Sequence, residues 1–177
     1  MAVPSSAGSL ISRAAPNTPG ASPLFLREEE IRRGVELLYF GYTRLTRSID
    51  EGLAGQGLGR AHHRALYFIA RQPDLTVSDL LRYLAITKQS LGRVLSELTE
   101  RNLIESRTGP VDRRQKLLRL TEAGQALESD LFEALRVKMA ATYVAAGRDN
   151  VTGFWRVLEG LVPDEDRSMV ASLGQEL

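Results

Sequence analysis

The segment from Thr76 to Asn102 constrains the fold more than any other part of the chain. Its sequence, TVSDLLRYLAITKQSLGRVLSELTERN, holds two short helical patterns separated by about three residues. Thr76, with Asp79 three residues later, and Thr87 precede the two patterns, where a hydroxyl can accept a hydrogen bond from a free backbone N–H. Two short helices joined in this way form a helix-turn-helix. The expected inward residues are Leu80, Leu81, Leu84, Leu91, Val94, Leu95 and Leu98.

The apolar period changes after Asn102. The runs LIESR (103–107) and KLLRL (116–120) are short and typical of strands, and Gly109-Pro110 begins the turn between them. This turn is rich in charge rather than in the usual small polar residues. We therefore predict a β-ribbon directly after the helix-turn-helix, which makes the module a winged helix-turn-helix with a two-stranded wing.

Longer helical patterns flank this module. Residues 27–54 repeat apolar side chains at steps of three and four, and residues 60–72 form a second helical pattern ended by Pro73. Thr121 precedes a third, and Asp149 or Asn150 is expected to cap a last helix over 151–162. The apolar stripe of the first helix is long enough to serve a partner helix as well as its own core. The chain is therefore predicted to be mainly α-helical, with long N- and C-terminal helices around the winged core, which we expect to form a dimerisation domain.

We divide the 177 residues into four parts. Residues 1–23, rich in Ser, Ala, Pro and Gly, are expected to be a disordered tail, and residues 24–57 to hold the first helix of the dimerisation domain. Residues 58–121 form the winged module, and residues 122–177 the C-terminal helices. The chain has no cysteine, no convincing secretory signal and no apolar run of membrane length, so we expect a cytoplasmic protein.

Charge is segregated along the chain. The formal net charge is only +1, but residues 58–121 contain 12 bases and 6 acids, whereas the remainder contains 11 bases and 16 acids. A basic block between acidic flanks is expected if only the middle of the chain meets a polyanion. Arginines on solvated helices could produce a similar balance.

Polar side chains outside the apolar stripe of the second helix are suited to reading DNA. Glutamine can bond adenine, and lysine or arginine can bond guanine, in the major groove. The alternative is a solvated polar face on a packing helix. Gly92, a poor helix former, suggests close approach to another backbone. The predicted DNA-binding residues of this helix are Thr87, Lys88, Gln89, Ser90 and Arg93.

The charged turn of the wing has a chemistry of its own. A narrow minor groove attracts arginine, and Asp112 is close enough to Arg114 to hold its guanidinium in one pose. Arg113 and Lys116 could follow phosphates. The alternative is a solubilising hairpin tip, which explains one or two charges but not a paired Asp-x-Arg in a basic block.

The run from 58 to 124 resembles the multiple-antibiotic-resistance regulator (MarR) family of bacterial winged-helix transcription factors. The resemblance rests on TVSDLLRYLAITKQSLGRVLSELTERNLIESR and on DRRQKLLRLTEAG, whose Asp-x-Arg and Leu-Thr-x-x-Gly recur there as a unit. It implies that Arg114 enters the minor groove, steadied by Asp112, and that residues 87–93 lie in the major groove. The position of Gly92 more often carries Ser or Thr in the family.

The resemblance also implies a triangular dimer built from the first and last two helices. Symmetry points the same way, because one helix-turn-helix reads about half of a pseudo-palindromic site. Burial within the protomer's own core is the alternative for each anchor. The predicted anchors are Leu24, Phe25, Leu26, Phe154, Trp155, Leu158 and Leu161.

The family commonly binds small, often phenolic, anions between the dimer domain and the winged core. The resemblance therefore implies a small aromatic or anionic ligand as a possible partner. Adjacent histidines point about 100° apart on a helix, so they chelate poorly, and one of them is expected to be a core or interface residue. The candidate pocket residues are Tyr39, Tyr42, His62, His63 and Arg64.

Catalytic motifs are missing from the sequence. It has no glycine-rich phosphate loop, no metal-ligand cluster and no nucleophile–base pattern, so we expect no enzyme, no cofactor and no metal site. The predicted function is a homodimeric, sequence-specific regulator of transcription that binds double-stranded DNA and represses. The alternative is a winged-helix interaction module that docks its basic wing on an acidic protein.

Overall fold

The computed structural model describes residues 23–173. The described residues divide after Gly41 into two units. The first contains the short 3-10 helix η1 (Pro23–Leu26) and the start of α1 (Glu28–Ala54), and α1 ends in the second. Except for Pro23, the tail predicted over residues 1–23 lies outside the described residues.

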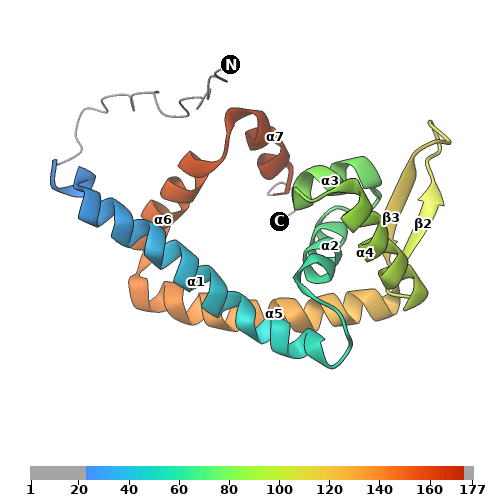
Figure 1. The fold of residues 1–177 in the computed structure, drawn as a ribbon, viewed down its shortest axis with the longest axis horizontal. Coiled ribbons are helices and arrows are strands. Elements are labelled where there is room, and N and C mark those ends of the chain that lie inside the picture. Colours follow the sequence, from blue (N-terminus) through green and yellow to red (C-terminus); the bar gives the residue numbers. More distant parts are fainter. Residues whose placement is uncertain (1–22, 174–177) are drawn as a thin grey trace, which may run out of the picture. The chain divides into compact units, whose positions relative to one another are not determined.

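The second unit carries the winged module and the C-terminal helices. The mainly helical fold with a winged helix-turn-helix core is confirmed, and the four-part division of the chain stays a prediction. The elements in chain order are α2 (Arg60–Arg71), β1 (Leu75–Thr76), α3 (Val77–Leu84), α4 (Lys88–Glu100), β2 (Ile104–Thr108), β3 (Lys116–Leu120), α5 (Glu122–Ala146), α6 (Arg148–Leu161) and α7 (Asp164–Leu173) (Figure 1).

Threonine hydroxyls begin three of these helices, as predicted. The Oγ1 atom of Thr76 accepts from the backbone N–H of Asp79 at 3.0 Å, and that of Thr87 accepts from Ser90 at 3.1 Å. Thr121 caps α5 through the N–H of Gly124 at 3.0 Å. Each cap satisfies a backbone donor that the first helical turn leaves free.

The wing belongs to a three-stranded antiparallel sheet in the order β1-β3-β2. Ile104 lies opposite Leu120 and Thr108 opposite Lys116, so β2 and β3 form the predicted hairpin, which ends in a free tip (Figure 1). The sequence predicted only these two strands. The third, β1, has two residues, too few to show an alternating pattern, and it forms because Leu75 pairs with Leu118.

One apolar core holds the second unit together. Its fully buried aliphatic side chains come from the end of α1, from α2, α3 and α4, and from the sheet. Each such side chain contributes roughly 1.5–3 kcal/mol when removed from water. The core therefore fixes the inner face of α4 and leaves its outer face free. The largest of these side chains are Ile49, Leu53, Leu66, Ile69, Leu75, Leu80, Leu84, Leu91 and Leu98.

The junction between the wing and α5 explains the Leu-Thr-x-x-Gly pattern. The backbone N–H of Thr121 donates to the carbonyl of Leu103 at 3.1 Å, and its hydroxyl donates to the carbonyl of Asn102 at 2.7 Å. A Cβ added to Gly124 would lie 1.9 Å from the Leu103 carbonyl oxygen. Only glycine lets the first turn of α5 come this close to the start of the hairpin.

The prediction for the start of α6 is wrong. The helix begins at Arg148, so Asp149 and Asn150 lie inside its first turn, and Gly147 occupies the N-cap position. Gly147 has φ of 78°, which glycine adopts without strain, and it also ends α5. The chain therefore turns directly from one helix into the next. A seventh helix, α7, follows Pro163 and was not predicted.

None of the helices within residues 23–173 is both long enough and apolar enough to cross a membrane.

Candidate nucleic-acid interface

The outer face of α4 is polar and exposed. Leu91, Val94 and Leu98 face the core. Apart from its chain neighbours and the backbone of its own helix, a Cβ at Gly92 would find no atom of the described structure within 4 Å, so the helix surface is open at this position. All five predicted DNA-binding residues of this helix region are exposed, namely Thr87, Lys88, Gln89, Ser90 and Arg93.

A tight backbone turn shapes the tip of the wing. The N–H of Gly109 donates to the carbonyl of Gln115, and the N–H of Gln115 donates to the carbonyl of Asp112, both at 3.0 Å. A Cβ at Gly109 would lie 2.8 Å from the Asp112 carbonyl oxygen, so this position requires glycine. The tip is therefore ordered by main-chain bonds, and its side chains are exposed.

Asp112 acts on Arg114 differently from the prediction. Its Oδ1 accepts from the backbone N–H of Arg114 at 2.9 Å, and the salt bridges of the described residues do not include this pair of side chains. An aspartate commonly bonds the backbone two residues later in a turn. Asp112 thus fixes the main chain that carries Arg114 rather than its guanidinium.

Arginines at the base of the wing are engaged by one carboxylate. Arg107 on β2 and Arg119 on β3 donate through Nε to Oδ1 of Asp74, at 2.8 and 2.7 Å. The salt bridges of the described residues contain no such partner for the tip residues Arg113, Arg114 and Lys116, which are exposed. The wing therefore neutralises cations at its base and presents them at its tip.

Sequence reasoning missed the Asp74 cluster (Asp74, Arg107 and Arg119). Hydrogen bonds from Arg119 and then Arg107 lower the pKa of Asp74 to about 2. Asp74 has φ of 67°, a conformation that aspartate tolerates better than most residues. The only local signal was the Pro-Asp turn, because 33 and 45 residues separate Asp74 from its partners.

The candidate ligand-pocket residues do not converge within the second unit. Nε2 of His62 lies 2.8 Å from Oε2 of Glu97 on α4, and Arg64 donates to the carbonyl of Tyr83 at 3.1 Å. His63 is the buried histidine, with 9% exposed and no hydrogen-bond partner at Nε2 in the described structure. Burial lowers its pKa, with Arg64 adding to the effect. Tyr42 and, in the first unit, Tyr39 are exposed.

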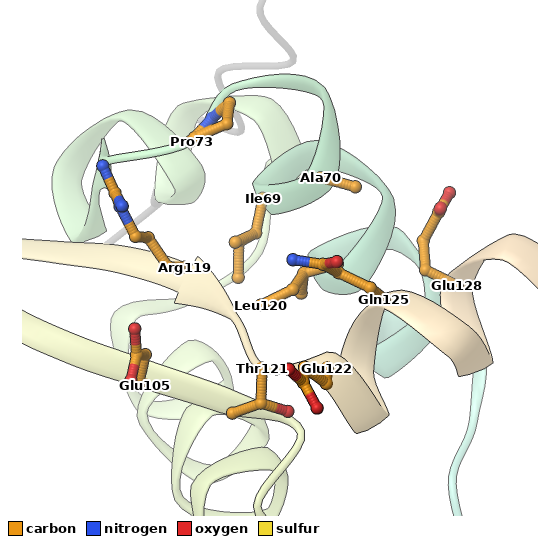
Figure 2. Close-up of a pocket in the computed structure, with 10 residues that line it drawn as sticks. All are labelled: Ile69, Ala70, Pro73, Glu105, Arg119, Leu120, Thr121, Glu122, Gln125 and Glu128. Carbon is orange, nitrogen blue, oxygen red and sulfur yellow. The ribbon is translucent and has the colours of Figure 1, made fainter.

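A cavity of about 660 Å³ lies elsewhere in the second unit, between the end of α2, β3 and the start of α5 (Figure 2). None of the candidate pocket residues lines it. Glu105, Glu122 and Glu128 give it an acidic wall, and burial raises the pKa of Glu128. Its one arginine, Arg119, is already bound to Asp74. Such a wall does not favour a small anion.

Large apolar side chains are exposed at the predicted dimer anchors. Phe25 and Leu26 in η1, and Phe154, Trp155 and Leu161 in α6, are all exposed, whereas Leu158 is half-buried. Leu24 also lies in η1. The indole N–H of Trp155 donates to the hydroxyl of Tyr143 at 3.0 Å, so part of this residue is used within the protomer.

Known proteins match the chain at both the sequence and the fold level. The sequence model of the MarR family matches residues 56–115. The HTH-type transcriptional regulator PetP of Rhodobacter capsulatus is 48% identical over 143 residues, which cover 81% of this chain and 86% of PetP. These relatives are transcription regulators and not enzymes.

The solved structures that share the fold at lower identity include a ligand complex and a DNA complex. NadR in complex with 4-hydroxyphenylacetate is 22% identical, with a TM-score of 0.63 over 70% of this chain and 88% of NadR. A MarR variant from E. coli in complex with operator DNA is also 22% identical, with a TM-score of 0.61 over 80% of this chain and 100% of that one.

Proposed function

Because the chain belongs to the MarR family and is a DNA-binding regulator of transcription rather than an enzyme, we propose that it is a homodimeric repressor of a pseudo-palindromic operator. It would act in the cytoplasm. One observation carries the proposal: the exposed polar face of α4 and the cationic wing tip extend from the same core-bound module. Helix and wing can thus engage adjacent grooves of one duplex.

In this proposal α4 reads base edges in the major groove. Lys88, Gln89, Ser90 and Arg93 supply the donors and acceptors that distinguish base pairs there. The hydroxyl of Thr87 donates to the hydroxyl of Ser90 at 2.8 Å, and this hydrogen bond keeps the two side chains together at the start of the helix. The open space at Gly92 lets the DNA approach the helix backbone closely.

The wing tip would enter the flanking minor groove. Arg114 is the inserted side chain, Asp112 fixes the main chain beneath it, and Arg113 and Lys116 contact phosphates. Dimerisation would bring two such modules onto the two halves of a site. The exposed apolar residues of η1 and those of α6 support the dimer, because large apolar side chains left in water on a protomer are available for burial at an interface.

A small aromatic or anionic effector is part of the proposal. NadR holds 4-hydroxyphenylacetate, and a related compound could regulate this chain. The buried Nε2 of His63 has no hydrogen-bond partner among the described residues, and it is the candidate atom for a phenol or an anion, because binding would satisfy it. Tyr39, Tyr42, His62 and Arg64 stay predictions for this site.

The decisive experiment titrates the purified chain into the labelled duplex from upstream of its own gene, with random-sequence competitor and at two salt concentrations. We expect one dimer per site, with log affinity falling against log salt by about 0.9 per phosphate contacted. Arg114→Ala should lower operator affinity by roughly fivefold or more, because it removes a base contact worth on the order of 1–3 kcal/mol.

The matched control is Arg136→Ala, which removes the same charge from α5, where Arg136 pairs with Glu133. It should bind the operator like the unchanged chain. If Arg114→Ala binds equally well, the wing assignment is wrong. If duplex DNA binds only weakly and without a footprint while an acidic protein is captured through the wing, the interaction module is the better description.

A further inference from the structure

Glu97 is an acid on the helix that the proposed function places in the major groove. Glu97 lies one turn after Arg93, and its carboxylate contacts two nitrogen-bearing side chains, Arg93 on α4 and His62 on α2. Its Oε1 accepts from Nε of Arg93 at 2.7 Å, and its Oε2 lies 2.8 Å from Nε2 of His62 on α2. A carboxylate on a DNA-binding surface repels phosphate, so its place there needs a compensating role.

His62 is held in one orientation by its own helix. The backbone N–H of Gly59 donates to Nδ1 of His62 at 3.0 Å, at the start of α2. Because Nδ1 accepts this hydrogen bond, the ring hydrogen lies on Nε2, and Nε2 donates a hydrogen bond to Oε2 of Glu97. The side chain of His62 is only 12% exposed, so it places Glu97 from a fixed position in α2.

Arg93 has the complementary arrangement. Its side chain is 83% exposed, and Glu97 binds only its Nε atom. Within residues 23–173 no hydrogen bond uses its two terminal nitrogens. A guanidinium held at Nε presents these terminal nitrogens as a fork, the geometry that binds O6 and N7 of guanine. The hydrogen bonds from Arg93 and then His62 also lower the pKa of Glu97, so the carboxylate stays ionised.

We propose that Glu97 and His62 are positioning residues that orient Arg93 to read one guanine in each half-site. The inference rests on the proposed function and adds a specificity-determining contact to it. Arg93 would otherwise lose rotamer freedom when it binds, and orientation beforehand reduces that loss. Glu97 thus lowers the general affinity for DNA by repelling phosphate, and in return it raises the discrimination between bases at a single base pair.

The test begins with a duplex selected by the full-length chain from a random-sequence library. Dissociation constants are then measured for every single base-pair change in this duplex and for a non-specific duplex. We expect Arg93→Ala to lose about fivefold or more of the preference for one guanine in each half-site. Glu97→Gln should lose preference at that same position. Its affinity for non-specific DNA should hold or rise, because a negative charge is removed.

Two further comparisons separate positioning from folding. Glu100→Gln removes the same charge from the same helix, but Glu100 contacts Ser96 at 3.0 Å, so the base profile should not change. His62→Asn can still accept from Gly59 but does not reach Glu97, whereas the longer His62→Gln can donate to Glu97. We expect His62→Gln to retain more of the guanine preference than His62→Asn. The double variant Arg93→Ala with Glu97→Gln should lose no more of the guanine preference at this position than Arg93→Ala alone.

A uniform loss of affinity for all duplexes in Glu97→Gln would overturn the inference, because it would indicate only a structural role. Loss of preference at different positions in Arg93→Ala and Glu97→Gln would also overturn it. If the library yields no enriched sequence, the proposed function itself fails, and this inference fails with it. Circular dichroism of each variant checks that the fold is intact.

Discussion

At the scale of single residues, Asp74 joins both strands of the wing to the turn after α2. The carboxylate of Asp74 binds an arginine from each strand of the hairpin. The backbone N–H of Asp74 donates to the carbonyl of Leu118 at 3.0 Å. These bonds join the turn after α2 to the base of the wing. The cluster therefore ties the base of the wing to the core, although none of its members was predicted as a functional residue.

Asp74→Asn should destabilise the fold in a pH-dependent way. The pKa of Asp74 is lowered to about 2 in the folded chain, from an ordinary value of 3.8. A lowered pKa means that the carboxylate stabilises the fold fully above the ordinary value, and that this contribution is lost as pH falls from about 4 to about 2. Urea unfolding at pH 6, 4 and 3 measures the free energy of unfolding of the unchanged chain and of Asp74→Asn. The difference between these two free energies should shrink as the pH falls. A difference that is constant with pH would contradict the ion-pair explanation. Asparagine also tolerates the positive φ, so the change tests the charge.

At the scale of elements, the contact between the hairpin and α5 depends on one missing side chain. Gly124→Ala places a Cβ against the Leu103 carbonyl, where backbone would have to move. We expect the free energy of unfolding to fall by about 1–3 kcal/mol, as in other overpacked sites. Chemical denaturation measures it.

Gly92→Ala is the matched control for this change, because it adds the same methyl group inside α4, where no atom of the described structure beyond the helix's own backbone and the chain neighbours lies within 4 Å. It should raise stability by up to about 1 kcal/mol, since alanine is the better helix former. Equal effects of the two substitutions would show that the close approach of α5 to Leu103 is not what requires glycine.

At the scale of the whole molecule, the proposed dimer makes a prediction of its own. Leu161 on α6 is 64% exposed in the protomer, so Leu161→Asp should leave the protomer core intact. If α6 lies in the dimer interface, the variant should shift toward monomer and lose operator affinity, because a buried unpaired charge is costly. Sedimentation of the full-length chain at several concentrations measures the shift.

The control for the dimer is Val111→Asp, which introduces the same charge at an apolar residue that is 98% exposed on the wing. It should keep the oligomeric state of the unchanged chain, even though a new acid at the wing tip should weaken DNA binding. A Leu161→Asp protein that sediments like the unchanged chain would place the interface away from this part of α6.

The sequence by itself determined most elements of this chain and the position of its basic surface. Helical periods, threonine caps and strand-like runs are local signals, so they predicted the helix-turn-helix, the hairpin and the long flanking helices. The exposed residues of α4 and the wing tip followed from the same patterns. Local signals failed at the start of α6, where Gly147 takes a turn that precedes the expected polar caps.

Only the tertiary structure decided how these elements are joined. Asp74 meets Arg107 and Arg119, His62 meets Glu97, and Gly124 meets Leu103 across separations that no periodic pattern encodes. The pairing of β1 with β3 belongs to the same class. Such contacts depend on where the shared core places each element. The sequence therefore identifies which polar side chains of α4 and the wing tip are exposed, and the packed structure decides which of them are held in position.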